Sequence, residues 1–125
     1  MKLTEVEPQF LRHTIRACAP GPDCNVISPH TEHEEYVYVD ALADADGIMF
    51  LCPKCFAANG GPVGTHSVIC WRPRVPANVS PGPGRWEFHG TGYGDLSLVA
   101  GSSSVLLTDG CRWHGFVTGG EVTSV

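Results

Sequence analysis

The sequence predicts a mainly β fold, built as one small domain of antiparallel strands, and three observations carry this prediction. The chain has 125 residues, which is enough for one ordinary hydrophobic core and too few for two. It contains 15 glycines and 10 prolines, so turns are frequent and long helices are disfavoured. Its apolar residues fall in short runs of aromatic and β-branched side chains, a pattern typical of strands.

These runs divide the chain into expected strands separated by turn residues. In residues 85–89, Trp86 and Phe88 alternate with polar side chains, as a half-buried strand requires. Gly119-Gly120 predicts a terminal hairpin, and the proline-rich stretch 72–84 predicts a surface loop. Both a short helix and a strand are compatible with residues 9–16. The expected strands are residues 35–40, 48–51, 66–71, 85–89, 96–99, 104–107, 113–118 and 121–125.

The prolines and the strand runs suggest a boundary near residue 35. Residues 1–34 carry four prolines and little periodicity, so we expect a poorly patterned N-terminal segment that packs on a β domain formed by residues 35–125. Acidic side chains concentrate in the first part of the chain. Residues 1–50 hold three basic and nine acidic side chains (3 − 9 = −6), whereas residues 51–125 hold five and four (5 − 4 = +1).

This charge distribution disfavours nucleic acid as a partner, because that binding draws its affinity mainly from phosphate neutralisation. The sequence shows neither a run of about 20 apolar residues nor a signal-peptide core, so no membrane association is expected. We therefore expect a reducing compartment such as the cytoplasm, in which the six cysteines serve as thiols and metal ligands before they serve as disulfides.

Two pairs of potential metal ligands carry the clearest chemical signal. Cys52-Pro53-Lys54-Cys55 and Cys111-Arg112-Trp113-His114 each separate two ligands by two residues, a spacing that lets a tight turn direct both side chains at one ion. Together they predict one structural zinc per chain, held by Cys52, Cys55, Cys111 and His114 as a zinc-ribbon-like Cys3His staple that joins the ends of two hairpins. Zinc is favoured because it prefers tetrahedral sulfur and nitrogen ligands.

Some cysteine and histidine residues leave alternatives open. A redox pair or inert thiols remain alternatives for Cys52 and Cys55, although residues 56–62 end too soon to form a thioredoxin helix. His66 is a possible extra ligand or a group that supports the ligands, or equally a hydrogen-bonded histidine at a strand start. Cys18 and Cys24 flank a turn and are expected to be free thiols, with a disulfide or a second metal pair as the alternatives.

No catalytic residue is predicted. The serines lack a nucleophile motif, and a catalytic zinc would need an open coordination position, whereas four protein ligands predict a closed ion. Trp71, Trp86 and Trp113 each adjoin an arginine, which is typical of single-strand nucleic acid binding. Neighbouring side chains on a strand point to opposite faces, however, so buried tryptophans beside outward arginines are the simpler interpretation.

The chain resembles a family of small bacterial and phage proteins of unknown function that are described as metal-binding. The resemblance covers about residues 35–125 and is most specific in the last motif. It implies a metal site and a bacterial or phage source, but it brings no known reaction. The motifs that carry it are Tyr36-Val37-Tyr38-Val39, Phe50-Leu51-Cys52-Pro53-Lys54-Cys55, His66-Ser67-Val68, Trp86-Glu87-Phe88, Leu96-Ser97-Leu98 and Cys111-Arg112-Trp113-His114-Gly115-Phe116-Val117 with Gly120.

These observations predict a non-catalytic, zinc-stabilised accessory or interaction protein, phage-encoded or a virion component in one variant. A nucleic-acid-binding zinc module and a zinc-dependent hydrolase are the alternatives. The expected partner is another protein or a second copy of the chain. The expected location is the cytoplasm of a bacterial host, or the virion.

Overall fold

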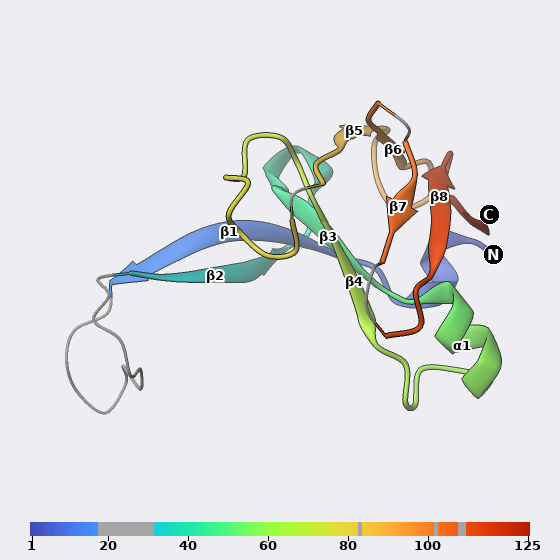
Figure 1. The fold of residues 1–125 in the computed structure, drawn as a ribbon. Coiled ribbons are helices and arrows are strands. Elements are labelled where there is room, and N and C mark those ends of the chain that lie inside the picture. Colours follow the sequence, from blue (N-terminus) through green and yellow to red (C-terminus); the bar gives the residue numbers. More distant parts are fainter. Residues whose placement is uncertain (18–31, 83, 102, 108–109) are drawn as a thin grey trace.

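A computed structural model describes residues 1–17, 32–82, 84–101, 103–107 and 110–125 of the chain (Figure 1). The predicted mainly β, antiparallel fold is confirmed, and each expected strand overlaps an observed one. The elements are η1 (Leu3–Val6), β1 (Gln9–Ala17), β2 (Glu32–Val39), η2 (Leu42–Asp44), β3 (Gly47–Leu51), α1 (Pro53–Asn59), β4 (Ser67–Trp71), β5 (Glu87–His89), β6 (Ser97–Val99), β7 (Val105–Leu106), β8 (His114–Thr118) and β9 (Glu121–Ser124).

The largest sheet has the strand order β2-β1-β3-β4 and is antiparallel throughout. Of the two structures compatible with residues 9–16, the strand is the one that forms. β1 lies between β2 and β3, so it is an inner strand of this sheet, and Leu3, Val6 and Phe10 are buried, so the N-terminal residues also contribute to the core. Beyond their pairing with the body of the sheet, β1 and β2 extend away from it as a long two-stranded arm (Figure 1).

Two smaller sheets complete the fold, one of β5 and β6 and one with the order β7-β8-β9. The predicted terminal hairpin is confirmed: β8 pairs with β9, and the two glycines between them have positive φ of 56° and 79°. A turn with two positive φ angles matches the twist of the flanking strands, and glycine adopts it without steric cost. The Gly119-Gly120 pair therefore sets the register of the last two strands.

The main core forms where one face of the large sheet packs against both small sheets. Phe50 of β3 meets Trp113 edge to face with ring centroids 6.1 Å apart, and Phe10 of β1 stacks on Tyr93 at 4.2 Å. The Tyr93 hydroxyl also accepts a hydrogen bond from the Phe10 amide at 2.9 Å. The contacts of Phe10 with Tyr93 tie the N-terminal strand to the second half of the chain.

A second, smaller cluster lies on the opposite face of the large sheet, beneath residues 72–82. Leu11, Trp71, Val75 and Val79 are buried there. The proline-rich segment is anchored by two side chains: the Trp71 indole donates to the Ser80 carbonyl at 3.0 Å, and the Arg85 guanidinium donates to several carbonyl oxygens of the segment. These acceptors are Val75, Pro76, Val79, Pro81 and Gly84.

Helix α1 is the element that sequence reasoning missed. Residues 52–55 are predicted to form a tight turn, and this turn is the start of a seven-residue helix with Cys52 as its N-cap and Pro53 in its first turn. Proline suits this position because it needs no amide donor there. The helix ends at Gly60, which takes the left-handed conformation with φ of 70°. None of the helices in the described part of the chain is both long and apolar enough to cross a membrane.

A substitution at Gly115 tests how closely the β8–β9 hairpin packs on Trp113. A Cβ atom at this position would lie 2.1 Å from the Thr123 carbonyl oxygen and 2.4 Å from Cζ2 of Trp113. Gly115→Ala is therefore expected to lower the free energy of unfolding by about 1–3 kcal/mol, measured by urea denaturation. Gly92→Ala is the matched control, because a Cβ atom there meets nothing within 4 Å. Equal losses in the two variants would contradict this account.

Candidate metal centre

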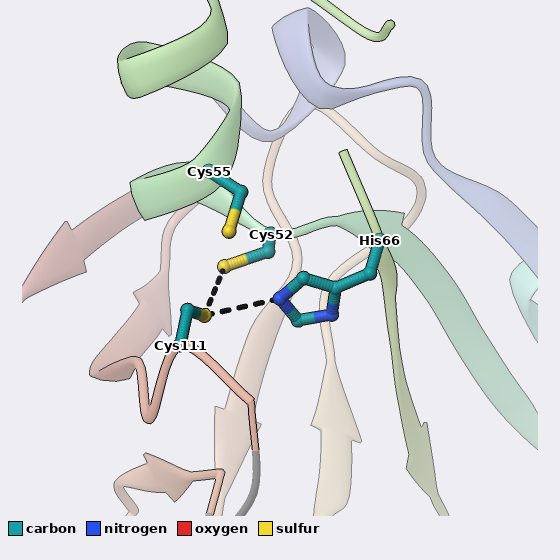
Figure 2. A group of neighbouring side chains, drawn as sticks. All are labelled: Cys52, Cys55, His66 and Cys111. Atoms are coloured by element: carbon teal, nitrogen blue, oxygen red, sulfur yellow. Dashed lines mark hydrogen bonds between the residues drawn. The ribbon is translucent and has the colours of Figure 1, made fainter. Parts of the chain in front are cut away.

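Four side chains from three parts of the chain converge at the margin of the main core (Figure 2). They are Cys52, Cys55, His66 and Cys111, and their ligand atoms all lie within 4.8 Å of one another. Sγ of Cys111 lies 3.3 Å from Sγ of Cys52 and 3.0 Å from Nε2 of His66. The structure therefore contains a Cys3His group that can hold a metal ion.

Strand pairing positions Cys52 and His66. β3 and β4 pair with Phe50 opposite Val68 and Leu51 opposite Ser67, so the next pair in this register is Cys52 and His66. The Cys52 amide donates to the His66 carbonyl oxygen at 2.8 Å, which extends the ladder by one pair. Residues directly opposite each other in an antiparallel pair project to the same face, so both side chains reach the same point.

Helix α1 supplies the third ligand. Cys52 caps the helix, and its carbonyl oxygen accepts a hydrogen bond from the Phe56 amide at 2.8 Å, which closes the first turn around residues 53–55. This turn returns the Cys55 side chain toward Cys52 (Figure 2). The predicted role of the two-residue spacing is thus fulfilled by a helical turn.

The fourth member, Cys111, comes from the connection between β7 and β8. The Leu107 amide donates to the Trp113 carbonyl at 2.9 Å and closes this connection, in which Gly110 and Arg112 have positive φ of 64° and 54°. The Lys54 ammonium donates to the Cys111 carbonyl oxygen at 2.8 Å. That bond joins the helix directly to the connection, and it brings a positive charge close to the thiols.

The spacing of the four atoms fits a tetrahedral metal ion. With metal–sulfur bonds of about 2.3 Å and metal–nitrogen bonds of about 2.0 Å, a tetrahedral zinc ion separates two sulfurs by about 3.8 Å and sulfur from nitrogen by about 3.6 Å. The observed separations at Cys111 are 3.3 Å and 3.0 Å. At Cys111 these two separations would need to lengthen by about 0.5 Å, and all four ligand atoms lie within 4.8 Å of one another.

Hydrogen bonds prepare both kinds of ligand for binding. Nε2 of His66 donates to Sγ of Cys111 at 3.0 Å when no metal is bound, and a shift of this proton to Nδ1, 3.3 Å from the carbonyl oxygen of Ser67, would free the Nε2 lone pair for a metal ion. Burial raises the pKa of the Cys52 thiol to about 11, and desolvation together with the hydrogen bond to Cys111 raises that of Cys55. At Cys111 desolvation also raises the pKa, but hydrogen bonds from His66, Cys52 and Cys55 outweigh it and lower the pKa to about 6.

The three thiols therefore differ in charge near neutral pH. Cys111 is mainly a thiolate, whereas Cys52 and Cys55 keep their protons and release them when a metal binds. A thiolate is the form of cysteine that ligates metal, so Cys111 is the first sulfur able to do so.

His114 was predicted as the fourth ligand, and it does not belong to the group. Trp113 is buried in the core and its indole lies over Gly115, so the alternation of β8 places His114 on the other face of the strand. There its ring lies near that of Phe116, at 6.4 Å, and it lines a surface cleft with Lys54 and Arg112. Arg112, which lies between Cys111 and His114 in the sequence, has a left-handed backbone conformation, so the side chains of Cys111 and His114 point in different directions.

The sequence predicts His66 only as a possible extra ligand or a group that supports the ligands, yet it is the histidine of the Cys3His group. A signal for it was present. The expected strands 48–51 and 66–71 can pair as antiparallel neighbours, and any register that places Leu51 opposite Ser67 also places Cys52 opposite His66. The spacing shared by Cys52–Cys55 and Cys111–His114 predicts ligands that are neighbours in sequence, whereas His66 is positioned by strand pairing.

The remaining cysteines lie elsewhere. Cys18 and Cys24 fall outside the described residues. Cys70 is fully buried in the main core, where burial raises the pKa of its thiol. It acts there as a small apolar side chain. Comparisons of the chain with protein-family models, with curated proteins and with solved structures found no match.

The two histidines can be separated by mutation. His66→Ala removes a member of the group and is expected to weaken Zn²⁺ binding by about 100-fold or more, whereas His114→Ala is expected to leave it within a few-fold of the unmodified chain. Competition with a chromophoric chelator measures both affinities. The reverse pattern, with loss in His114→Ala alone, would show that His114 is the ligand and that His66 is not.

Proposed function

We propose that this protein is a non-catalytic accessory or interaction protein whose fold is stabilised by one structural zinc ion, held by Cys52, Cys55, His66 and Cys111. The observation that carries the proposal is the Cys3His group itself. It joins the end of the β3–β4 pair, the first turn of α1 and the β7–β8 connection.

Zinc is the metal that best suits this donor set. Three thiolates and one imidazole in a tetrahedral arrangement are typical of structural zinc sites, whereas carboxylate-rich sets suit magnesium, calcium and manganese. The group includes no carboxylate. Binding would couple to folding, because the ligands come from segments up to 59 residues apart.

The donor set also argues against the hydrolase alternative. Four protein ligands complete the tetrahedral shell, so no position is left for a water molecule that the ion could activate. Lys54, the charged side chain within the first ligand pair, is bonded to the Cys111 carbonyl oxygen. Its role is therefore to hold the β7–β8 connection in place.

The surroundings of the tryptophans argue against the nucleic-acid alternative. Trp71 and Trp113 are each only 2% exposed, and Trp86 is half-buried against the main core. The neighbouring Arg72 and Arg85 donate to backbone carbonyl oxygens, and Arg72 also lies over the Phe88 ring at 4.6 Å. Buried indoles cannot stack on bases, and these arginines already serve the fold.

The proposed source and setting follow from the resemblance to small metal-binding proteins of bacteria and phages. We place the protein in the cytoplasm of a bacterial host or, as a variant, in a phage particle, acting through contacts with another protein chain. The long exposed arm of β1 and β2 supports a role in contacts between chains, since an exposed strand edge is a common binding surface.

Metal analysis tests the structural zinc. Protein purified without added metal or a metal-binding tag is expected to contain one zinc per chain by mass spectrometry. Removing zinc with a chelator, or Cys55→Ser, is expected to lower the free energy of unfolding by several kcal/mol (on the order of 3–5). Unchanged thermal stability after complete zinc removal would contradict a structural role.

Cobalt substitution separates a closed site from an open one within the same experiment. Tetrahedral Co²⁺ in a closed Cys3His shell is expected to keep its visible spectrum when azide or imidazole is added. A spectrum that shifts would indicate an exchangeable position and would favour the hydrolase alternative.

Binding to single strands tests the nucleic-acid alternative. Because the indoles of Trp71 and Trp113 are buried, we expect labelled single-stranded DNA and RNA to bind with a Kd no tighter than roughly 100 μM at physiological salt, measured by fluorescence anisotropy. Arg112→Ala, which changes an exposed cation beside Trp113, is expected to leave this weak signal unchanged. Micromolar binding that is lost in Arg112→Ala would favour the nucleic-acid module.

A further inference from the structure

The arm formed by β1 and β2 concentrates exposed apolar side chains. Four of the nine large hydrophobic side chains that are exposed among the described residues lie on it: Ile15, Tyr36, Val37 and Tyr38, with exposed fractions of 54%, 41%, 42% and 63%. Tyr36, Tyr38 and Ile15 share one face of the arm, on which the Tyr36 ring lies 6.2 Å from Tyr38 and 6.3 Å from Trp71. Val37 lies on the other face.

Among the described residues β2 is the outermost strand of its sheet, so its backbone presents an open edge to them. Leu11 accepts from the Asp46 amide and His13 donates to the Asp46 carboxylate, so these two residues of β1 direct their backbone groups toward β3. Arg12, between these two residues, and Thr14, after them, therefore direct their backbone groups toward β2, where they pair with Val37 and Glu35. Backbone groups alternate along a strand, so Glu34, Tyr36 and Tyr38 direct theirs to the open edge.

The apolar half of this edge lacks the features that normally prevent strand pairing. Residues 36–39, Tyr-Val-Tyr-Val, contain no lysine, proline or glycine, and they pair with β1 without a bulge. Such a segment on an exposed edge is a template for a further strand.

The distribution of charge along β2 favours a second copy of the same strand in the antiparallel direction. The first half of β2 carries Glu34 and Glu35, and the second half is apolar. Parallel pairing of two copies in register would place each glutamate opposite its equivalent. Antiparallel pairing about a two-fold axis instead moves the acidic halves to opposite ends and brings the apolar halves together.

One antiparallel register matches the apolar residues best. With Val37 opposite Val37 of the second copy, each Tyr36 faces a Tyr38 on the aromatic face and each Glu35 faces a Val39. The like-charged pair of Glu34 and Asp40 then falls at the outer ends of the contact. A small hollow of about 180 Å³ beside Tyr36, lined also by Trp71 and Val79, lies on the face that receives the second copy's tyrosine.

We propose that two copies of this chain associate through the open edges of β2, antiparallel about a two-fold axis at Val37, so that their four-stranded sheets become one. This inference rests on the proposed function in one respect: it names the partner of the interaction protein as a second copy. The backbone N–H and C=O groups that Tyr36 and Tyr38 direct outward find their hydrogen-bond partners on the β2 strand of the second copy. The paired tyrosines cover the exposed aromatic face.

Sedimentation of the full, zinc-loaded chain tests the proposal. We expect a dimer that dissociates on dilution, with the amides of Tyr36 and Tyr38 gaining protection from hydrogen exchange in the dimer. Val37→Lys places a charge at the two-fold axis and is expected to weaken dimerisation at least about tenfold. Tyr38→Lys, the second variant, places a charge on the aromatic face of the contact and is also expected to weaken dimerisation. Val63→Lys, at a position 87% exposed and outside the arm, is the matched control and should leave the dimer unchanged.

A chain that stays monomeric up to roughly millimolar concentration overturns the proposal. So does a dimer that both arm variants leave intact, since its interface would lie elsewhere. Zinc content, measured on every sample, separates the two proposals. A monomer with one zinc per chain refutes the β2 contact and leaves the proposed function standing, whereas a chain that folds without zinc refutes the proposed function whatever its mass.

Discussion

The antiparallel pairing of β3 with β4 is the interaction on which the rest of the structure depends. One face of this pair, with Ile48, Phe50, Val68 and Cys70, contributes to the main core. The other face carries Trp71, which packs in the second cluster. Gly47 lies opposite Trp71 and can only be glycine there, because a Cβ atom would lie 2.4 Å from the indole. The same register ends at Cys52 and His66, so a shift of one residue would disrupt both clusters and the Cys3His group together.

The Cys3His group lies where the core reaches the surface, and its residues differ in exposure accordingly. Cys52 is fully buried and belongs to the main core, whereas His66 is exposed. Packing thus holds one sulfur rigidly, and the other ligands approach it from the helix and from the β7–β8 connection. This arrangement suits an ion that stabilises the closure of a fold, since each ligand it binds fixes a segment that the small core alone constrains weakly.

The two ends of the large sheet have opposite character. The end near the Cys3His group meets α1 and the β7–β8 connection. The arm of β1 and β2 lies away from these elements and leaves aromatic side chains and one strand edge exposed (Figure 1). Stability and recognition can therefore reside in different parts of one small chain. In the proposed dimer, substitutions at the arm would alter contacts between chains without reaching the Cys3His group.

The amino-acid sequence by itself determined the class of fold, the approximate position of every expected strand, the terminal hairpin at Gly119-Gly120 and three members of the Cys3His group. These features follow from local patterns: short β-branched runs, glycine pairs and cysteines spaced by two residues. Only the tertiary structure decided that residues 9–17 are an inner strand and that the fourth member is His66. The reason is physical. A two-residue spacing restricts ligands that are neighbours in sequence, whereas the histidine is selected by a register between strands and by the burial of Trp113, which turns His114 to the opposite face.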